Sequence, residues 1–287
     1  MRFPTKRRWK QLLLLLVCVE IFVNVYGCAS SLVLHPSTHH IDAKGAVAKK
    51  IPFGDSYVEV WTSRSPACGD GEPKASVLEF CGNGTRAEEI ASWVAQNRWA
   101  KWPIELWVLN YPGYGGSPGN ARLASIPPAA LTAYDALHAA APDRPIFLES
   151  NSLGGCSVTY VAGRRPVAAA IITNPPPLKR LIWQHHGWWN LWLLSTPVAW
   201  QVPTDMNTPD TGPLCTAPAC FLLADGDWVI PPKYHDMVVT AYGGPKTVID
   251  VVGADHNHPL SAESEAELAK WIDQQWARVF PTTQPTK

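Results

Sequence analysis

The stretch between Pro145 and Ala162 constrains the fold of this 287-residue chain more than any other part of it. It begins with a short apolar run, Pro145 to Leu148, which indicates a buried strand. The run breaks sharply at residues 150–155, Ser-Asn-Ser-Leu-Gly-Gly, and continues from Cys156 as a segment that can form a helix. A strand, a tight turn that carries a serine and a helix form the arrangement in which a strained turn presents a nucleophile.

Ser152 is the candidate nucleophile at this turn. Ser150 and Gly154 flank it at minus two and plus two. Such a turn needs small neighbours because two backbones approach each other closely there. The usual pattern at such a turn is Gly-x-Ser-x-Gly, and here Ser150, another small residue, replaces the first glycine. The alternative interpretation is a glycine-rich helix start after an ordinary strand.

Strand-like and helix-like segments alternate along most of the chain. Residues 47–52 and 57–62 alternate apolar and polar side chains, which predicts an opening antiparallel pair. Further strands are expected at 76–80, 104–109, 145–148, 167–173, 219–224 and 247–252, and helices at 86–99, 128–140, 156–162, 233–241 and 263–280. This alternation predicts an α/β fold with a mainly parallel sheet covered on both faces. Ligands of such sheets bind beyond the carboxyl ends of the strands.

The charge balance excludes one class of partner. The formal net charge is zero, so the chain carries no electrostatic footprint for nucleic acid. No His-Glu-x-x-His or comparable ligand set occurs, and we expect neither a metal nor another cofactor. Fourteen tryptophans and 46% apolar residues favour a well-filled core or an apolar binding surface.

The N-terminus has the pattern of a secretory signal. Five basic residues, Arg2, Lys6, Arg7, Arg8 and Lys10, precede an apolar run from Leu12 to Val19, and small residues follow at 27–31. We interpret residues 1–27 as a signal peptide. Residues 25–28 resemble a bacterial lipoprotein signal, which implies lipidation of Cys28 and a membrane protein that faces the periplasm or the cell exterior. A cleaved soluble signal and an uncleaved anchor remain as alternatives.

The rest of the chain divides simply. Residues 28–44 show no sustained periodicity and are expected to be a tether, residues 45–281 a single domain, and residues 282–287 a frayed tail. In an oxidising compartment Cys215 and Cys220 could close a small loop, and Cys68 could pair with Cys81. Cys156 is then left over, and we expect it to be buried and inert.

A serine nucleophile needs a base, and the base needs an acid to fix its tautomer. Asp227 and His256 follow Ser152 in the chain in the order acid, then base. Asp225 competes for the role of the acid, and His258 competes for that of the base. The other histidines considered are expected to be solvated: His185, His186 and His235.

Five stretches together resemble the serine α/β-hydrolase superfamily, and most closely its branch related to serine aminopeptidases and membrane-associated acyl-protein thioesterases. They are residues 81–84, 111–119, 150–155, 225–231 and 253–257. The resemblance implies an α/β-hydrolase fold and cleavage of an ester or thioester, or of an amide, in a small-molecule or acylated substrate.

The same resemblance implies an oxyanion hole formed by the backbone N–H groups of Leu153 and Asn83. Two residues depart from the family pattern: Cys81 replaces a histidine before the oxyanion glycine, and Ser150 replaces the elbow glycine. A buried small side chain and a disulfide partner are equally good interpretations of Cys81. The alternative function is a non-catalytic binding or structural lipoprotein that keeps the fold.

Residues 178–218 form a tryptophan-rich insertion between two expected strands, and in this topology an insertion there covers the active site. One interpretation is an apolar acyl or aromatic pocket that lies against a membrane. The other is a helix packed on the sheet, with its tryptophans as core filler.

Overall fold

The computed structural model describes residues 6–26, 29–185, 187–188, 191–193 and 195–281. Eight strands form one sheet: β1 (Val47–Phe53), β2 (Ser56–Arg64), β3 (Ala75–Phe80), β4 (Ile104–Leu109), β5 (Ile146–Asn151), β6 (Ala169–Thr173), β7 (Ala219–Ala224) and β8 (Lys246–Val251). Their order is β1-β2-β4-β3-β5-β6-β7-β8. The pairs β1–β2 and β2–β4 are antiparallel, and the remaining pairs are parallel. The predicted mainly parallel sheet with an antiparallel opening pair is therefore confirmed.

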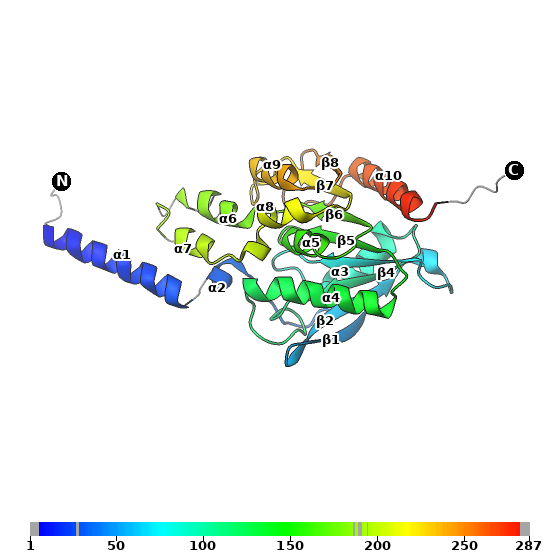
Figure 1. The fold of residues 1–287 in the computed structure, drawn as a ribbon, viewed down its shortest axis with the longest axis horizontal. Coiled ribbons are helices and arrows are strands. Elements are labelled where there is room, and N and C mark those ends of the chain that lie inside the picture. Colours follow the sequence, from blue (N-terminus) through cyan, green and yellow to red (C-terminus); the bar gives the residue numbers. More distant parts are fainter. Residues whose placement is uncertain (1–5, 27–28, 186, 189–190, 194, 282–287) are drawn as a thin grey trace.

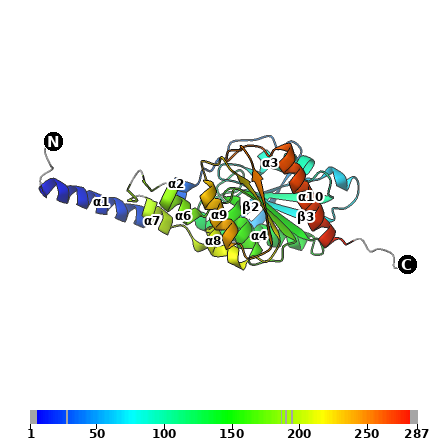
Figure 2. The ribbon, with the colours of Figure 1, turned by 90° about the horizontal axis from the view of Figure 1, so that it is seen from above.

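Helices cover both faces of the sheet (Figure 2). One face is covered by α3 (Ala87–Trp93), by the π-helical turn η2 (Val94–Arg98) that extends it, and by α10 (Ala262–Val279). The other is covered by α4 (Ile126–Ala140), α5 (Gly154–Ala162) and α9 (Pro232–Ala241). Successive strand residues point to opposite faces, so Leu78 and Phe80 pack with α4 and α5 while Val77 packs with α3. Two single turns complete the body of the domain: η1 (Pro66–Cys68) and η3 (Leu123–Ser125).

The insertion between β6 and β7 forms a cap of short helical pieces at the carboxyl ends of the strands (Figure 1). They are α6 (Leu178–Arg180), η4 (Leu181–His185), α7 (Ser195–Trp200), η6 (Thr204–Met206), α8 (Thr208–Thr211) and η7 (Gly212–Leu214). Two of its described tryptophans fit neither interpretation of the insertion. Trp188 is 68% exposed and Trp200 is 78% exposed, so they are neither core filler nor the lining of an enclosed pocket. Trp189 lies outside the described residues.

A long N-terminal helix, α1 (Lys6–Tyr26), projects from the domain and passes beside α7 (Figure 1). It covers most of the predicted signal peptide. Within the described ranges, no helix combines the length and the hydropathy that a bilayer crossing requires. Cys28, the predicted lipidation site, lies outside the described residues, as does the predicted tail at 282–287.

The segment expected to be a tether lies on the domain instead. It begins with α2 (Ala29–Val33), and Ala29 and Leu34 are both buried in the core. The Ser37 carbonyl accepts hydrogen bonds from Gly115 N at 2.9 Å and from the Arg86 side chain at 3.1 Å. These partners are distant in sequence and belong to loops, so the periodicity of residues 29–44 carried no sign of them.

The structure contradicts both candidate disulfides, because all four cysteines are free thiols. Cys68 contacts the Ile104 carbonyl at the amino end of β4, whereas Cys81 follows β3 at its carboxyl end. Six strand residues span about 20 Å, and a disulfide joins Cα atoms less than about 7 Å apart. Cys215 and Cys220 pack on opposite faces of the sheet. Cys156 is buried, as predicted, and burial raises the pKa of its thiol to about 12.

Candidate active site

Ser152 stands at a sharp turn between β5 and α5. Its φ is +52°, in the left-handed region that residues other than glycine rarely adopt. Its N–H donates to the Thr173 carbonyl at 2.8 Å, which fixes the turn against the neighbouring strand. A Cβ added to Gly154 would lie 2.1 Å from the Phe80 carbonyl oxygen, so only glycine fits there. The local sequence therefore folds as predicted, and Ser150 takes the place of the first glycine as the buried penultimate residue of β5.

The structure brings Ser152, His256 and Asp227 together from three loops at the carboxyl edge of the sheet. The distance between His256 Nε2 and Ser152 Oγ is 2.9 Å, and that between His256 Nδ1 and Asp227 Oδ2 is 2.6 Å. Asp227 and His256 are buried. A neutral imidazole that donates from Nδ1 to the carboxylate leaves Nε2 free to accept the serine proton.

The two alternative residues lie apart from this chain of hydrogen bonds. Asp225 Oδ1 accepts a hydrogen bond from Gly253 N at 2.7 Å, so this carboxylate supports the loop that carries His256. His258 follows two residues after His256, on the same loop, and lines a different cavity. The geometry therefore selects Asp227 and His256 as the partners of Ser152.

Asp227 is held by more groups than the sequence suggested. Its Oδ1 accepts from the amides of Val229 and Ile230 at 2.9 and 2.7 Å. His235 on α9 was expected to be solvated, but it is 1% exposed and its Nε2 lies 3.4 Å from Asp227 Oδ2. Burial alone would raise the pKa of Asp227, but the contacts with His235, His256 and the Ile230 amide outweigh it and hold that pKa below its usual range.

Two further histidines were expected to be solvated. His185 is half-buried and packs edge-on against Tyr234, and His186 lies outside the described residues.

Asn174 supports the loop that carries His256, and this role was not predicted from the sequence. It follows β6 with a φ of +45°. Its Nδ2 donates to the His256 carbonyl at 3.2 Å, and its Oδ1 accepts from Ala224 N at 2.9 Å. It thereby ties the His256 loop to the end of β7. An asparagine directly after a predicted strand and before three prolines was the one available signal.

The predicted oxyanion loop after β3 lies beside Ser152. A Cβ added to Gly82 would be 3.5 Å from the Cβ of Ser152. Asn83 follows Gly82, and Leu153 caps the start of α5, and both residues line the same cavity as Ser152. Cys81, where the family pattern has histidine, is a buried thiol, and burial together with the nearby Glu79 carboxyl raises its pKa well above the usual range.

The side chain of Asn83 binds the N-terminal segment. Its Nδ2 donates to the Val33 carbonyl at 2.6 Å, and its Oδ1 accepts from His35 N at 2.9 Å and from the Tyr114 hydroxyl at 3.1 Å. The oxyanion loop is thus clamped to the N-terminal segment, residues 29–44, which the sequence had predicted to be a tether.

A cavity of about 610 Å³ opens at Ser152 and runs under the cap. Its lining is mainly aliphatic and comes from four parts of the chain: Leu32 and Val33 of α2, Leu153 after the turn, Leu178, Leu181, Ile182 and Val198 of the cap, and Val229 and Ile230 beside the acid. The cap therefore does supply an apolar lining, but with aliphatic side chains and with none of the tryptophans among its described residues.

No model of a known protein family matches the chain, and no curated protein matches it in sequence. Solved structures do resemble it. Est1E from Butyrivibrio proteoclasticus with ferulic acid bound has a TM-score of 0.64 at 19% identity, over 80% of this chain and 100% of that one. A puromycin-hydrolyzing peptidase of Mycobacterium tuberculosis has a TM-score of 0.60 at 18% identity, over 81% of this chain and 39% of that one.

An acylaminoacyl peptidase of Pyrococcus horikoshii has a TM-score of 0.58 at 11% identity, over 81% of this chain and 41% of that one. The likeness to these structures and the strand order define the class: the chain has the α/β-hydrolase fold, with a cap between β6 and β7. The predicted fold class is confirmed.

Proposed function

We propose that this protein is a serine hydrolase that cleaves an ester or thioester, and less readily an amide, through an acyl-enzyme. The observation that carries the proposal is the chain of hydrogen bonds from Asp227 through His256 to Ser152 at the mouth of an apolar cavity. The peptidases among the similar structures, and the ferulic acid bound by Est1E, support a hydrolase that acts on a carboxylic acid derivative.

The chemistry follows from the positions of the three side chains. Ser152 Oγ attacks the acyl carbonyl carbon, and His256 Nε2 takes the hydroxyl proton. The bond to the leaving oxygen or sulfur breaks, and the leaving group departs with the proton from His256. Water then attacks the acyl-enzyme by the same route and releases the acid. The N–H groups of Leu153 and Asn83 receive the oxyanion, and each such donor contributes about 3 kcal/mol to transition-state stabilisation.

The proposal is tested with p-nitrophenyl esters of graded chain length and with an active-site serine phosphonate. Turnover of the esters, with stoichiometric labelling at Ser152, supports a hydrolase. A folded protein that neither turns over any ester nor reacts with the phosphonate is instead a binding or structural protein that keeps the fold.

Acyl chain length should matter because the cavity under the cap is aliphatic. We expect kcat/KM to rise with chain length, since each buried methylene contributes up to about 0.8 kcal/mol. Ile182→Ala and Val198→Ala should flatten this dependence, because both side chains line the cavity. Trp188→Ala is the matched control, since Trp188 is exposed on the same cap. A steeper effect of Trp188→Ala than of Ile182→Ala would place the acyl chain elsewhere.

The N-terminal pattern supports a further part of the proposal: export across the inner membrane and a lipid on Cys28, with a membrane-associated acylated substrate as in the thioesterase-like branch. Cys28→Ser should then move the protein from the membrane fraction to the soluble fraction, and mass spectrometry of the mature N-terminus measures the modification directly. An unlipidated terminus at Ala29 or beyond contradicts the lipoprotein interpretation.

A further inference from the structure

A second cavity, of about 860 Å³, opens beside His256 on the face of the sheet covered by α3 and α10. Gly82, Asn151 and His256 line both this cavity and the apolar one, so the two meet at the triad. The acyl group has its place under the cap. The leaving group has to lie beside His256, because the imidazolium donates its proton to the leaving atom. The second cavity offers that place.

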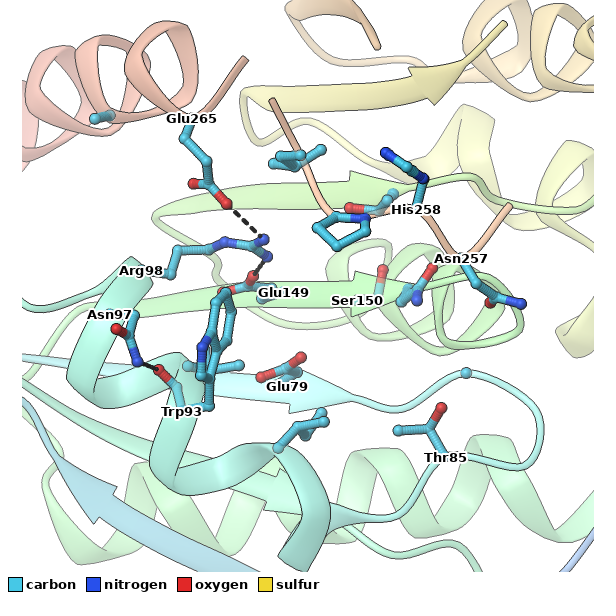
Figure 3. A pocket seen from close by; sticks show the side chains of 18 of the residues that line it. Glu79, Thr85, Trp93, Asn97, Arg98, Glu149, Ser150, Asn257, His258 and Glu265 are labelled. Carbon is cyan, nitrogen blue, oxygen red and sulfur yellow. Dashed lines mark hydrogen bonds and ion pairs between the residues drawn. The ribbon is translucent and has the colours of Figure 1, made fainter. Parts of the chain in front are cut away.

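Its inner wall is acidic (Figure 3). Glu149 on β5 is buried, pairs with the Arg98 guanidinium and accepts from Trp99 Nε1 at 2.6 Å. Arg98 also pairs with Glu265 on α10 at 3.2 Å. With Glu79 included, three carboxyl groups face one guanidinium around this wall.

Glu79 is the unusual member of this group. It pairs in register with Glu149 on the adjacent strand, so both side chains point to the same face of the sheet. Glu79 is 5% exposed, and its side-chain Oε2 is buried without a hydrogen-bond partner among the described atoms. Figure 3 shows its carboxyl group facing the space that Arg98 and Glu149 also border. Buried carboxyl groups in proteins are normally paired, so this one is short of a donor.

A second acceptor on the same face has no donor either. Asn151 Oδ1 is buried without a partner among the described atoms, and Asn151 lies two residues beyond Glu149 on β5. The site therefore presents acceptors and negative charge. A protonated amine is complementary to both, since it carries N–H donors, a positive charge and no acceptor.

We propose that this cavity is the leaving-group subsite, that Glu79 pairs there with a protonated amine, and that the preferred substrates are acyl esters of amino alcohols. This inference rests on the proposed hydrolase function and adds the identity of the leaving group. The amino alcohol departs from the acyl-enzyme with the proton that His256 took from Ser152, and its ammonium group keeps its own proton.

Two esters that differ in one atom test the inference: 2-(dimethylamino)ethyl hexanoate and 3-methylbutyl hexanoate, which are isosteric in the leaving group. A hydrogen bond between charged partners predicts that the wild-type protein favours the amine ester roughly 10- to 100-fold in kcat/KM. Glu79→Gln should bring this ratio near one, because kcat/KM for the amine ester should fall by more than kcat/KM for the neutral ester. Glu89→Gln, which removes an exposed carboxylate from the same cavity, should keep the preference.

The outcomes separate the two proposals. If wild-type protein hydrolyses both esters equally, or if Glu79→Gln keeps the preference, the leaving-group inference is overturned and the hydrolase remains. If a folded wild-type protein hydrolyses neither ester and does not react with the phosphonate, the hydrolase proposal and this inference both fall.

The pH dependence of the ratio gives a second measurement that needs no variant. Burial, with the neighbouring Glu149 carboxylate, raises the pKa of Glu79 well above its usual range, and Arg98 opposes this only in part. Glu79 must lose its proton to pair with an ammonium group, so the preference for the amine ester should rise as pH rises through the raised pKa of Glu79. The other charged or titratable side chains around it, among the described residues, are Cys81, Glu89, Lys101, His256, His258 and Glu265. Both esters need the same triad, so its contribution cancels in the ratio, and a ratio that stays constant with pH contradicts the inference.

Discussion

Ser152→Ala should reduce ester turnover by roughly a thousandfold or more, with little change in the melting temperature. The Ser152 hydroxyl oxygen lies 2.9 Å from His256 Nε2 and is the acyl acceptor of the proposed mechanism. His256→Ala should cost about as much, and the double variant no more than either single one, because the two side chains act as one unit. Steady-state kinetics and melting curves on the three variants measure both effects.

The control for this prediction is the phosphonate probe. Wild-type protein should become labelled on Ser152 and both single variants should not, while circular dichroism shows that all remain folded. Turnover in Ser152→Ala that stays within tenfold of wild type would assign the chemistry to another nucleophile.

Asp227→Asn is the second change with a large expected effect, a loss of about 10⁴-fold in kcat. Two backbone amides, those of Val229 and Ile230, hold Oδ1 as an acceptor. The amide nitrogen of an asparagine would therefore replace Oδ2 and donate to His256 Nδ1. That bond fixes the tautomer with the proton on Nε2, which can no longer accept the proton of Ser152. Kinetics across pH on a variant of unchanged melting temperature measure the loss.

Asp225→Asn is the matched control, two residues away. Asp225 accepts one bond from Gly253 N, and an asparagine can still accept it through its oxygen. We expect activity within a few-fold of wild type. A greater loss in Asp225→Asn than in Asp227→Asn would reverse the assignment of the acid.

The elbow and the order of the triad could be predicted because each depends on a short stretch of sequence. Residues 146–155 encode a strand, a strained turn and a helix start by local composition alone. The strands were found for the same reason, since they are short apolar runs between polar turns. The choice between Asp225 and Asp227 needed coordinates, because both residues follow β7 within three positions and differ only in the direction of their side chains.

Contacts between distant parts of the chain could not be predicted in this way. The packing of residues 29–44 depends on Asn83, Arg86 and Gly115, which lie in loops without a repeating pattern. The burial of His235 depends on how α9 packs against the loop of Asp227. The exposure of Trp188 and Trp200 depends on the course of the cap, which composition does not specify.

Two glutamates on the wall of the second cavity occupy sequence positions that could have predicted a site there. Glu79 and Glu149 each stand within an apolar strand run, next to Leu78 and Leu148. A carboxyl group at a buried strand position is costly unless it has a partner or a function. Two such positions, paired across adjacent strands near the edge where ligands bind, could have marked this wall from the sequence alone.

The clamp between Asn83 and the N-terminal segment has a consequence for how the protein would find its substrate. A lipid on Cys28 would be separated from Leu32, on the cavity wall, by three intervening residues, and the four steps between the two Cα atoms reach at most about 14 Å. Because this segment is so short, the cavity mouth would stay at the level of the lipid head groups and could not reach the bulk solution. Encounter would then be a two-dimensional search within one leaflet, and substrate density per unit of membrane area, not concentration in solution, would set the rate.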